Sequence, residues 1–368
     1  PVLLLAKPSV AKAATAAPPH NEHSLVLANA PPFVLTCAFF AALDALLLGY
    51  DIGVVSGILH FVQAEFSLST HQTEIFASAI NAAAIVGALS SGYLADKSGR
   101  KSALFLSSFV FTTGSFMMAL APTYPRLLFG RVLQGYGVGA GLLIAPMFIS
   151  EIAPPAYRGS LVTLSEVSLS LGVLLAYMAN FALATVPGQW RWMLALGAFP
   201  GILLTLRILC LPESPRWLVA HGQPEQAAAV LSRTLPGESE RERADVLRAI
   251  TRRIAVEKAV GWLDFIRRRS TLVSLSVGLV VACLQHAVGI ESIIYYSPII
   301  FRKAGVSSTR LAILGTVAMG LVKLIFETYA LLNIDKIGRR PLLLYGSAGL
   351  TLALPGIGAS LTAAVTAA

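Results

Sequence analysis

The sequence predicts an all-α protein that crosses a membrane about nine times. Of its 368 residues, 55% are hydrophobic and only 13% are charged, whereas a soluble domain carries about 25% charged residues. The mean hydropathy is +0.71, and apolar runs of about 20 residues, the length that spans a bilayer, recur along the chain. We expect spans at residues 33–57, 72–94, 102–121, 126–149, 159–183, 190–211, 271–300, 308–334 and 342–364.

The charge distribution is typical of a membrane protein rather than of a nucleic-acid-binding one. The net charge is +9, but the basic residues gather in alternate loops, an asymmetry that sets orientation in a bilayer. We therefore expect the amino terminus and the even-numbered loops to face the cytoplasm, and no nucleic-acid partner. Cys37, Cys210 and Cys283 stand singly, without metal or redox spacing, and are interpreted as small hydrophobic residues.

The predicted spans divide the chain into four regions. Residues 1–32 are rich in Ala and Pro and are expected to form a mobile tail. Residues 33–211 form a six-helix half, residues 212–270 a cytoplasmic helical linker, and residues 271–368 a partial second half with helices seven to nine. Because the second half has three predicted helices against six in the first, we expect the sequence to lack three further spans.

A repeat supports this division. Residues 96–101 are Asp-Lys-Ser-Gly-Arg-Lys and close the second span, while residues 335–340 are Asp-Lys-Ile-Gly-Arg-Arg and close the eighth. The same pattern thus returns after six helices, which indicates a duplication of the kind found in transporters built from two halves.

The linker contains helix signals of its own. Ser214 before Pro215 is typical of a helix N-cap with proline at the first position, and Ser239 with Glu242 forms a capping box. Apolar residues every fourth position from Val246 to Ile254 predict an amphipathic helix that lies against the bundle. A calmodulin-type target helix is the alternative.

Two charged residues stand inside predicted spans. Asp51 interrupts the apolar run that begins at Leu46, and Arg131 lies near the start of the fourth span. An ionisable group at membrane depth costs a few kcal/mol, roughly, so it usually serves a pathway, a partner or a proton. The fourth span also carries Gly135, Gly137, Gly139 and Gly141, which predict close packing against a neighbouring helix rather than a hinge.

Several ordered motifs resemble the sugar-porter branch of the major facilitator superfamily, across nearly all of residues 33–364. They are Gly49-Tyr50-Asp51, Gly92 with 96–101, Gly130-Arg131, residues 145–154 (Ala-Pro-Met-Phe-Ile-Ser-Glu-Ile-Ala-Pro) with Arg158-Gly159, residues 212–217 (Pro-Glu-Ser-Pro-Arg-Trp), and Tyr296-Ser297-Pro298. The resemblance implies the major facilitator fold, with two six-helix halves of which the second is truncated here.

Within that branch the sequence most resembles plant-type polyol/monosaccharide–proton symporters. Glu166 and Lys323 stand where hexose carriers usually have glutamine and asparagine, and the polyol group shares both. The sequence departs from the branch at three places. Phe148 replaces a tyrosine, Gln285-His286 replaces a Gln-Gln pair, and Glu291 stands where Asn or Asp is typical.

The resemblance implies that Asp51 takes up the coupling proton and pairs alternately with Arg131. Arg131 would hold Asp51 ionised while the two are close, and burial would favour protonation once they separate. The alternative is a permanent salt bridge that only fixes packing.

An uncharged polyol needs several converging donors and acceptors with an aromatic surface, because each hydroxyl that leaves water needs a partner. Lys323 has two possible partners, Glu166 across the cavity, which we favour, and Glu327 one helical turn on. For each candidate, helix–helix hydrogen bonding is the alternative. The candidate substrate residues, partly placed by the resemblance, are Glu166, Gln285, His286, Glu291, Tyr295, Tyr296 and Lys323.

The cytoplasmic charges match family positions that bridge the two halves and bias a conformational equilibrium. The alternative is that these charges only cap helices and fix the topology in the membrane. The predicted gating groups are Asp96 with Arg100, Glu151 with Arg158, Glu213 with Arg216, and Asp335 with Arg339 and Arg340.

We expect a proton symporter for a small polyol or monosaccharide that works by alternating access. It would be a monomer without a cofactor other than the proton, and would lie in the plasma membrane rather than in a vacuolar or plastid membrane. A proton-independent facilitator and a transporter-like sugar sensor are the alternatives. An enzyme is not expected, because the sequence has no nucleotide-binding loop, metal cluster or nucleophile–base set.

Overall fold

The computed structural model describes residues 30–155, 158–259, 269–306 and 308–367. The predicted tail at 1–32 lies almost entirely outside these ranges. Within them all regular structure is helical, and nine helical segments are long and apolar enough to cross a membrane. The spans are α3 (Pro32–Glu65), α4 (Thr70–Ser98), α5 (Arg100–Ala119), α6 (Tyr124–Ile152), α7 (Arg158–Leu183), α8 (Gln189–Ile208), the broken pair α13 (Arg269–Ala287) and α14 (Ile290–Lys303), α15 (Thr309–Ile337) and α16 (Arg339–Ala367).

The predicted spans are confirmed, with one difference at the end of the first span and a break inside the seventh. The first helix continues to Glu65 instead of stopping at residue 57, because residues 58–65 remain helical until Phe66. The seventh span, predicted as one helix over 271–300, is divided at Gly289, which has a φ of +75°. Glycine reaches this left-handed conformation without strain, so it permits the change of direction.

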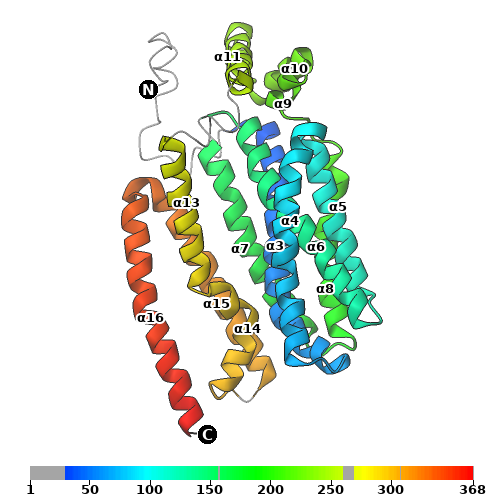
Figure 1. Ribbon diagram of the computed structural model, residues 1–368, viewed down its shortest axis with the longest axis vertical. Helices are drawn as coiled ribbons and strands as arrows, with labels where there is room; N and C mark the ends of the chain where they lie inside the picture. Colours follow the sequence, from blue (N-terminus) through cyan, green and yellow to red (C-terminus); the bar gives the residue numbers. More distant parts are fainter. Residues whose placement is uncertain (1–29, 156–157, 260–268, 307, 368) are drawn as a thin grey trace.

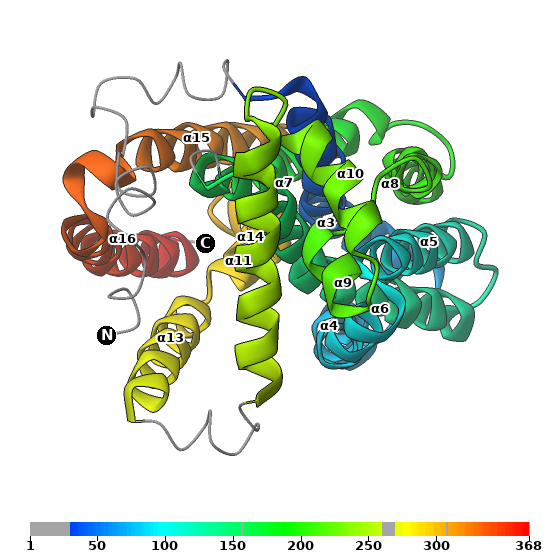
Figure 2. The same cartoon turned by 90° about the horizontal axis from the view of Figure 1, so that it is seen from above.

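The first six spans pack into one bundle in which α3 is a central element (Figures 1 and 2). Glycines join α3 to α7. A Cβ on Gly49 would lie 1.8 Å from the carbonyl oxygen of Leu169, and one on Gly172 would lie 2.2 Å from that of Leu46. Only the absence of a side chain lets the two backbones approach so closely.

The glycine-rich stretch of α6 packs as predicted, but against three helices. A Cβ on Gly139 would lie 1.9 Å from the Ala84 carbonyl oxygen of α4, and one on Gly137 would lie 2.7 Å from the Ser107 carbonyl oxygen of α5. Gly141 instead meets the side chain of Asp44 on α3. Each neighbour thus uses a different glycine.

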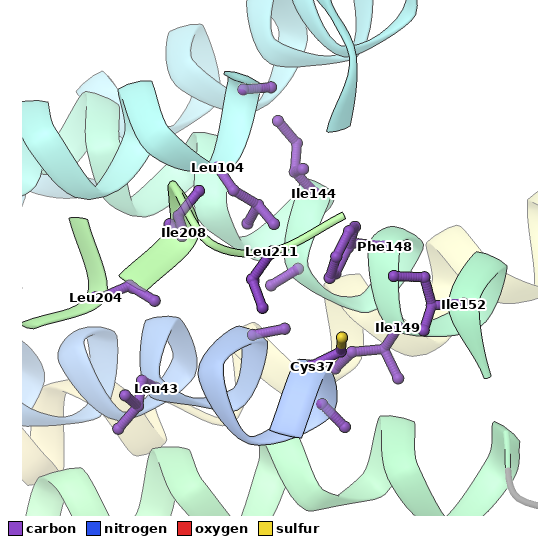
Figure 3. Packing of buried hydrophobic residues seen from close by; sticks show 14 of the residues in the cluster. Cys37, Leu43, Leu104, Ile144, Phe148, Ile149, Ile152, Leu204, Ile208 and Leu211 are labelled. Atoms are coloured by element: carbon purple, nitrogen blue, oxygen red, sulfur yellow. The ribbon is translucent and has the colours of Figure 1, made fainter. Parts of the chain in front are cut away.

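A buried apolar cluster closes the bundle near the start of α3. Figure 3 shows side chains of α3, α5, α6 and α8 converging there. Phe148, which stands where the resembled family has tyrosine, is fully buried in this cluster, and so is Cys37. Both residues therefore serve packing at this end of the bundle.

The linker forms α9 (Pro215–Ala220), α10 (Pro224–Thr234) and α11 (Glu240–Ala259), which lie at the end of the bundle where α3 begins, here called the linker end (Figure 1). Both predicted caps are present. The Ser214 Oγ accepts from the backbone N–H of Arg216 at 3.2 Å, and the Ser239 N–H donates to the Glu242 carboxylate at 2.7 Å.

The later spans are less enclosed. α14 packs against α3, and α15 packs against α7 and α14. α13 and α16 stand to one side of the bundle in Figure 2 and bury none of their most apolar stretches within the described residues. Large apolar side chains such as Leu279 and Leu352 are consequently exposed.

Candidate functional site

Asp51 and Arg131, predicted to pair, are in contact at the centre of the first bundle. The Arg131 Nη1 lies 2.5 Å from the Asp51 Oδ1, and both side chains have an exposed fraction of 0%. The Arg131 guanidinium also lies over the ring of Phe76, 5.4 Å from its centroid. Neither charge faces lipid, so the pair is an internal polar site rather than a surface feature.

Gln134, one turn along α6 from Arg131, extends this pair into a network that sequence analysis missed. Its Oε1 accepts from the Arg131 Nη1 at 3.0 Å, and its Nε2 donates to the Ser115 Oγ of α5, also at 3.0 Å. A glutamine three residues after an intramembrane arginine was the available signal, since i and i+3 share a helix face.

The pair is only partly satisfied. The Asp51 Oδ2 and the Arg131 Nε and Nη2 are buried without a hydrogen-bond partner. A buried ion pair offsets the cost of desolvation only when its remaining donors and acceptors are also bonded. This geometry therefore leaves the Asp51–Arg131 contact weaker than a fully bonded pair.

The backbone of α3 holds Asp51 in this direction. The hydroxyl of the neighbouring Tyr50 donates to the Met193 carbonyl oxygen of α8 at 2.8 Å. Gly49 and Gly53 seat α3 on α7 on the opposite side of the helix. With about 100° between successive residues, these contacts turn Asp51 away from α7 and towards α6.

A second buried acid, Asp44, shares the α3 face of Asp51 and was also missed. Its exposed fraction is 9%, and a Cβ on Gly141 would lie 1.8 Å from its Oδ2. The sequence signal was its position seven residues before Asp51, because seven residues complete almost two helical turns and return to the same helix face.

The predicted substrate residues that the structure describes differ widely in burial. Glu166 on α7 and Gln285 and His286 on α13 are exposed, whereas Tyr295 on α14 is buried and Tyr296 is half-buried. The side chain of Glu291 lies outside the described residues. These positions come from helices that are only partly packed against one another.

Lys323 forms an ion pair with Glu327, which lies one helical turn further along α15. Glu327 was one of the two partners considered from the sequence. The Lys323 Nζ also donates to the Ser170 Oγ of α7 at 2.8 Å. Ser170 lies one turn from Glu166, so Lys323 reaches the helix that carries the favoured partner but bonds a different residue of it. The contact links the first half to the second.

At the linker end, the charges form a network whose pairing differs from the prediction. Asp96 pairs with Arg100 at 3.2 Å as expected. Glu151, expected to pair with Arg158, instead accepts from Arg100 at 3.0 Å and from the Ser214 Oγ at 2.5 Å. The side chain that reaches Glu151 is set by how α5 and α6 meet, which spacing along the chain does not encode.

Glu213 is expected to pair with Arg216, but its described bonds are to backbone N–H groups. It accepts from Arg100 at 2.9 Å and from Ser214 at 2.8 Å. Burial raises the pKa of its carboxyl above its usual range, although these bonds and the Arg100 charge act in the opposite direction. Gly99 has a φ of +96°, and its missing side chain leaves room for the Glu213 carboxylate.

Arg158 donates to the Ala153 carbonyl oxygen at 3.3 Å. Burial lowers its pKa, and the nearby charges of Arg253 and Arg216 lower it further. The Asp335 and Arg339 side chains lie outside the described residues, and Arg340 is exposed.

A cavity of about 360 Å³ is lined by Arg100, Met147, Ser150, Glu151, Arg158, Arg216, Ile250 and Arg253.

Among the described residues, no group of three or more His, Cys, Asp or Glu side chains is arranged to hold a metal ion. Of the three cysteines, Cys37 is buried, while Cys210 and Cys283 are exposed.

Known proteins show the same architecture and sequence pattern. The chain is 36% identical over 340 residues to probable polyol transporter 4 of Arabidopsis thaliana, covering 91% of this chain and 65% of that protein. It is 37% identical over 348 residues to probable polyol transporter 3 of the same plant, covering 90% and 68%. The chain thus spans about two thirds of the length of these relatives.

A solved structure of XylE, a major facilitator superfamily proton:xylose symporter bound to 6-bromo-6-deoxy-D-glucose, aligns with a TM-score of 0.75. The sequences are 26% identical, and the alignment covers 84% of this chain and 71% of that one. The fold is therefore that of the major facilitators. The profile of the sugar (and other) transporter family matches residues 37–368, and the chain belongs to this family.

Proposed function

We propose that the whole protein carries a small polyol or monosaccharide across a membrane together with a proton, by alternating access. The observation that carries the proposal is the buried Asp51–Arg131 pair, whose Oδ2, Nε and Nη2 atoms lack partners. The polyol transporters among its relatives and the proton:xylose symporter XylE support the substrate class and the coupling ion.

The coupling step follows from the electrostatics of the pair. While Arg131 is 2.5 Å away, its positive charge stabilises the ionised form of Asp51. If movement of α3 against α6 separates the two, an isolated carboxylate at this depth is costly and a proton removes the charge. The neutral acid then allows the surrounding helices to pack over it, so proton binding biases one conformation.

The substrate would meet α7, α13, α14 and α15, which carry the candidate residues. Tyr295 supplies a buried aromatic surface, and Lys323 with Ser170 supplies polar groups where α7 and α15 meet. Hydroxyl groups of a polyol can both donate to and accept from such side chains. Substrate binding and the contact between the two halves would thus involve the same residues.

Asp51→Asn in the full-length protein, reconstituted into vesicles, tests this function. Uptake of a labelled polyol driven by a pH gradient should fall to the level without a gradient, while counterflow of the same polyol continues. Gradient-driven accumulation that matches wild type would contradict the proposal. Uptake in wild type that ignores the gradient would indicate a facilitator, and absence of counterflow for a whole polyol and monosaccharide panel would favour a sensor.

We further propose that the protein works as a monomer in the plasma membrane. Membrane fractionation of cells that express the full-length protein and light scattering of the purified protein in detergent would test these two points.

A further inference from the structure

Asp44 is a buried acid that the coupling step above does not use. It lies in the fourth turn of α3 with an exposed fraction of 9%. Within the described part of the chain, no hydrogen bond or ion pair reaches its carboxyl group. Most buried charges are paired, so an unpaired acid in this position needs an explanation.

The space around Asp44 fits its carboxyl group closely. A Cβ on Gly141 would lie 1.8, 2.5 and 2.7 Å from the Oδ2, Cγ and Oδ1 of Asp44. The carboxyl group therefore occupies the volume that any other residue at position 141 would fill. Gly141 builds a pocket for this one side chain where α3 meets α6.

No described cation compensates for the carboxyl group. On α6, Arg131 is bonded to Asp51. Arg207 of α8 lies over the ring of Phe40, 6.0 Å from its centroid. Arg233 of α10 lies over the ring of Phe33, at 3.9 Å.

Among the described side chains, the acids on the elements packed against α3 are also engaged elsewhere or exposed. Glu151 of α6 accepts from Arg100, Asp96 of α4 pairs with the same arginine, and Glu166 of α7 is exposed. On α14, which also touches α3, the Glu291 side chain lies outside the described residues, and Tyr295 is buried. The Asp44 site is thus a pocket for an acid without a counter-ion.

We propose that Asp44 is a second proton-binding site, in which the carboxyl group is held in its protonated, uncharged form by the α3–α6 contact. An ionised carboxylate that is buried without a partner is far more costly than a neutral acid, which only needs to bury one polar group. The ligand is a single proton, which is released as a proton to water when the contact opens, leaving the carboxylate.

Its position relative to Asp51 gives the site a place in transport. Seven residues place the two acids on one face of α3, about 10 Å apart along the helix axis at 1.5 Å per residue. Asp44 is the nearer of the two to the linker end, the side predicted to face the cytoplasm. It therefore lies on the side to which a proton that leaves Asp51 must travel.

Infrared spectroscopy of the purified full-length protein at neutral pH tests the site without any transport assay. Wild type should show the C=O stretch of a protonated carboxylic acid, and Asp44→Asn should lose it. Asp51→Asn and Asp245→Asn, which remove a paired acid and an exposed acid, should retain it. An unchanged carboxylic-acid signal in Asp44→Asn would overturn the proposal.

Two further measurements guard against a variant that fails to fold. Labelling unmutated protein with isotope-substituted aspartate should shift the same band, and the absence of any shifted band would refute a protonated aspartate. Gly141→Ala adds a methyl group into the pocket and should shift or abolish the band although it removes no acid. An unchanged band there would mean that Gly141 does not shape the site.

A third experiment measures transport and therefore rests on the proposed function. In vesicles oriented with the linker end inside, the uptake rate of wild type should depend on internal pH, and Asp44→Asn should flatten this dependence while counterflow continues. An identical dependence in both proteins would remove Asp44 from the proton route. If wild type showed no proton-driven uptake at all, the proposed function would fail and the infrared result alone would decide the Asp44 site.

Discussion

The first six spans and the later ones differ in how deeply they bury their polar side chains. In α3–α8, charged side chains such as Asp51 and Arg131 are fully enclosed, and glycines bring the backbones of neighbouring helices together. In α13–α16, the Lys323–Glu327 pair is partly exposed, with exposed fractions of 23% and 40%, and several glycines have open space around them. The comparison teaches that the Asp51–Arg131 pair, the proposed coupling site, is built entirely within one half, whereas the candidate substrate residues depend on how the halves meet.

The largest difference should come from removing one charge in each half. Arg131→Met leaves Asp51 buried without a partner, and loss of one member of a buried pair costs about 3–5 kcal/mol. Lys323→Met breaks a partly exposed pair, which contributes about 0–1 kcal/mol. Equilibrium unfolding of the two variants in detergent measures both losses.

A combined variant sharpens this result. Asp51→Asn together with Arg131→Met removes both charges and should recover part of the stability that Arg131→Met alone loses. Equal losses in Arg131→Met and Lys323→Met would show that burial does not separate the two halves.

The next effect should come from glycines. Gly139→Ala places a methyl group 1.9 Å from the Ala84 carbonyl oxygen, so α4 and α6 must move apart, and overpacking of this kind costs about 1–3 kcal/mol. Gly349→Ala in α16 meets nothing within 4 Å and should change stability by less than about 1 kcal/mol. The midpoint of thermal unfolding should fall for the first variant only. A similar fall for both would mean that the backbone approach of α4 and α6 contributes little.

The smallest effect concerns pH and the linker end. Because the folded state raises the pKa of Glu213, the folded protein holds that proton more tightly than the unfolded chain does. Glu213 should therefore reduce stability as pH rises through its usual value of 4.5 towards the raised pKa. Thermal unfolding over this range should show a steeper decline with pH for wild type than for Glu213→Gln.

Glu242 is the matched control with the opposite sign. Its bonds to Ser239 lower the pKa of its carboxyl, so the stability that it contributes is present above 4.5 and is lost as pH falls through the lowered value. The Glu242→Gln variant should therefore lose less stability than wild type as the pH falls below 4.5. Identical pH profiles for both glutamine variants would contradict the assignment of Glu213 as the buried acid.

The spans, the caps and the Asp51–Arg131 contact could be predicted from the sequence. Span positions follow from the length of apolar runs, and the Ser214 and Ser239 caps follow from local backbone chemistry, which requires no knowledge of tertiary packing. The pairing of Asp51 with Arg131 followed from the resemblance to a family. These features depend on neighbours in the chain or on a known pattern.

The remaining features depend on how helices meet. The Asp44 pocket exists because Gly141 of another helix lies opposite, and Glu151 bonds Arg100 rather than Arg158 because α5 approaches α6 there. The break at Gly289 was not predicted because glycine is tolerated inside membrane helices and so does not mark an end. Such contacts are set by three-dimensional packing, which one-dimensional periodicity does not contain.

Proton movement that accompanies substrate tests the role of the Asp51–Arg131 pair most directly. Full-length protein in weakly buffered vesicles is mixed with a transported polyol, and the external pH is recorded. The account predicts that the medium becomes alkaline with wild type, and that Asp51→Asn gives no pH change although labelled polyol still exchanges. Alkalinisation of the same size in Asp51→Asn would contradict it.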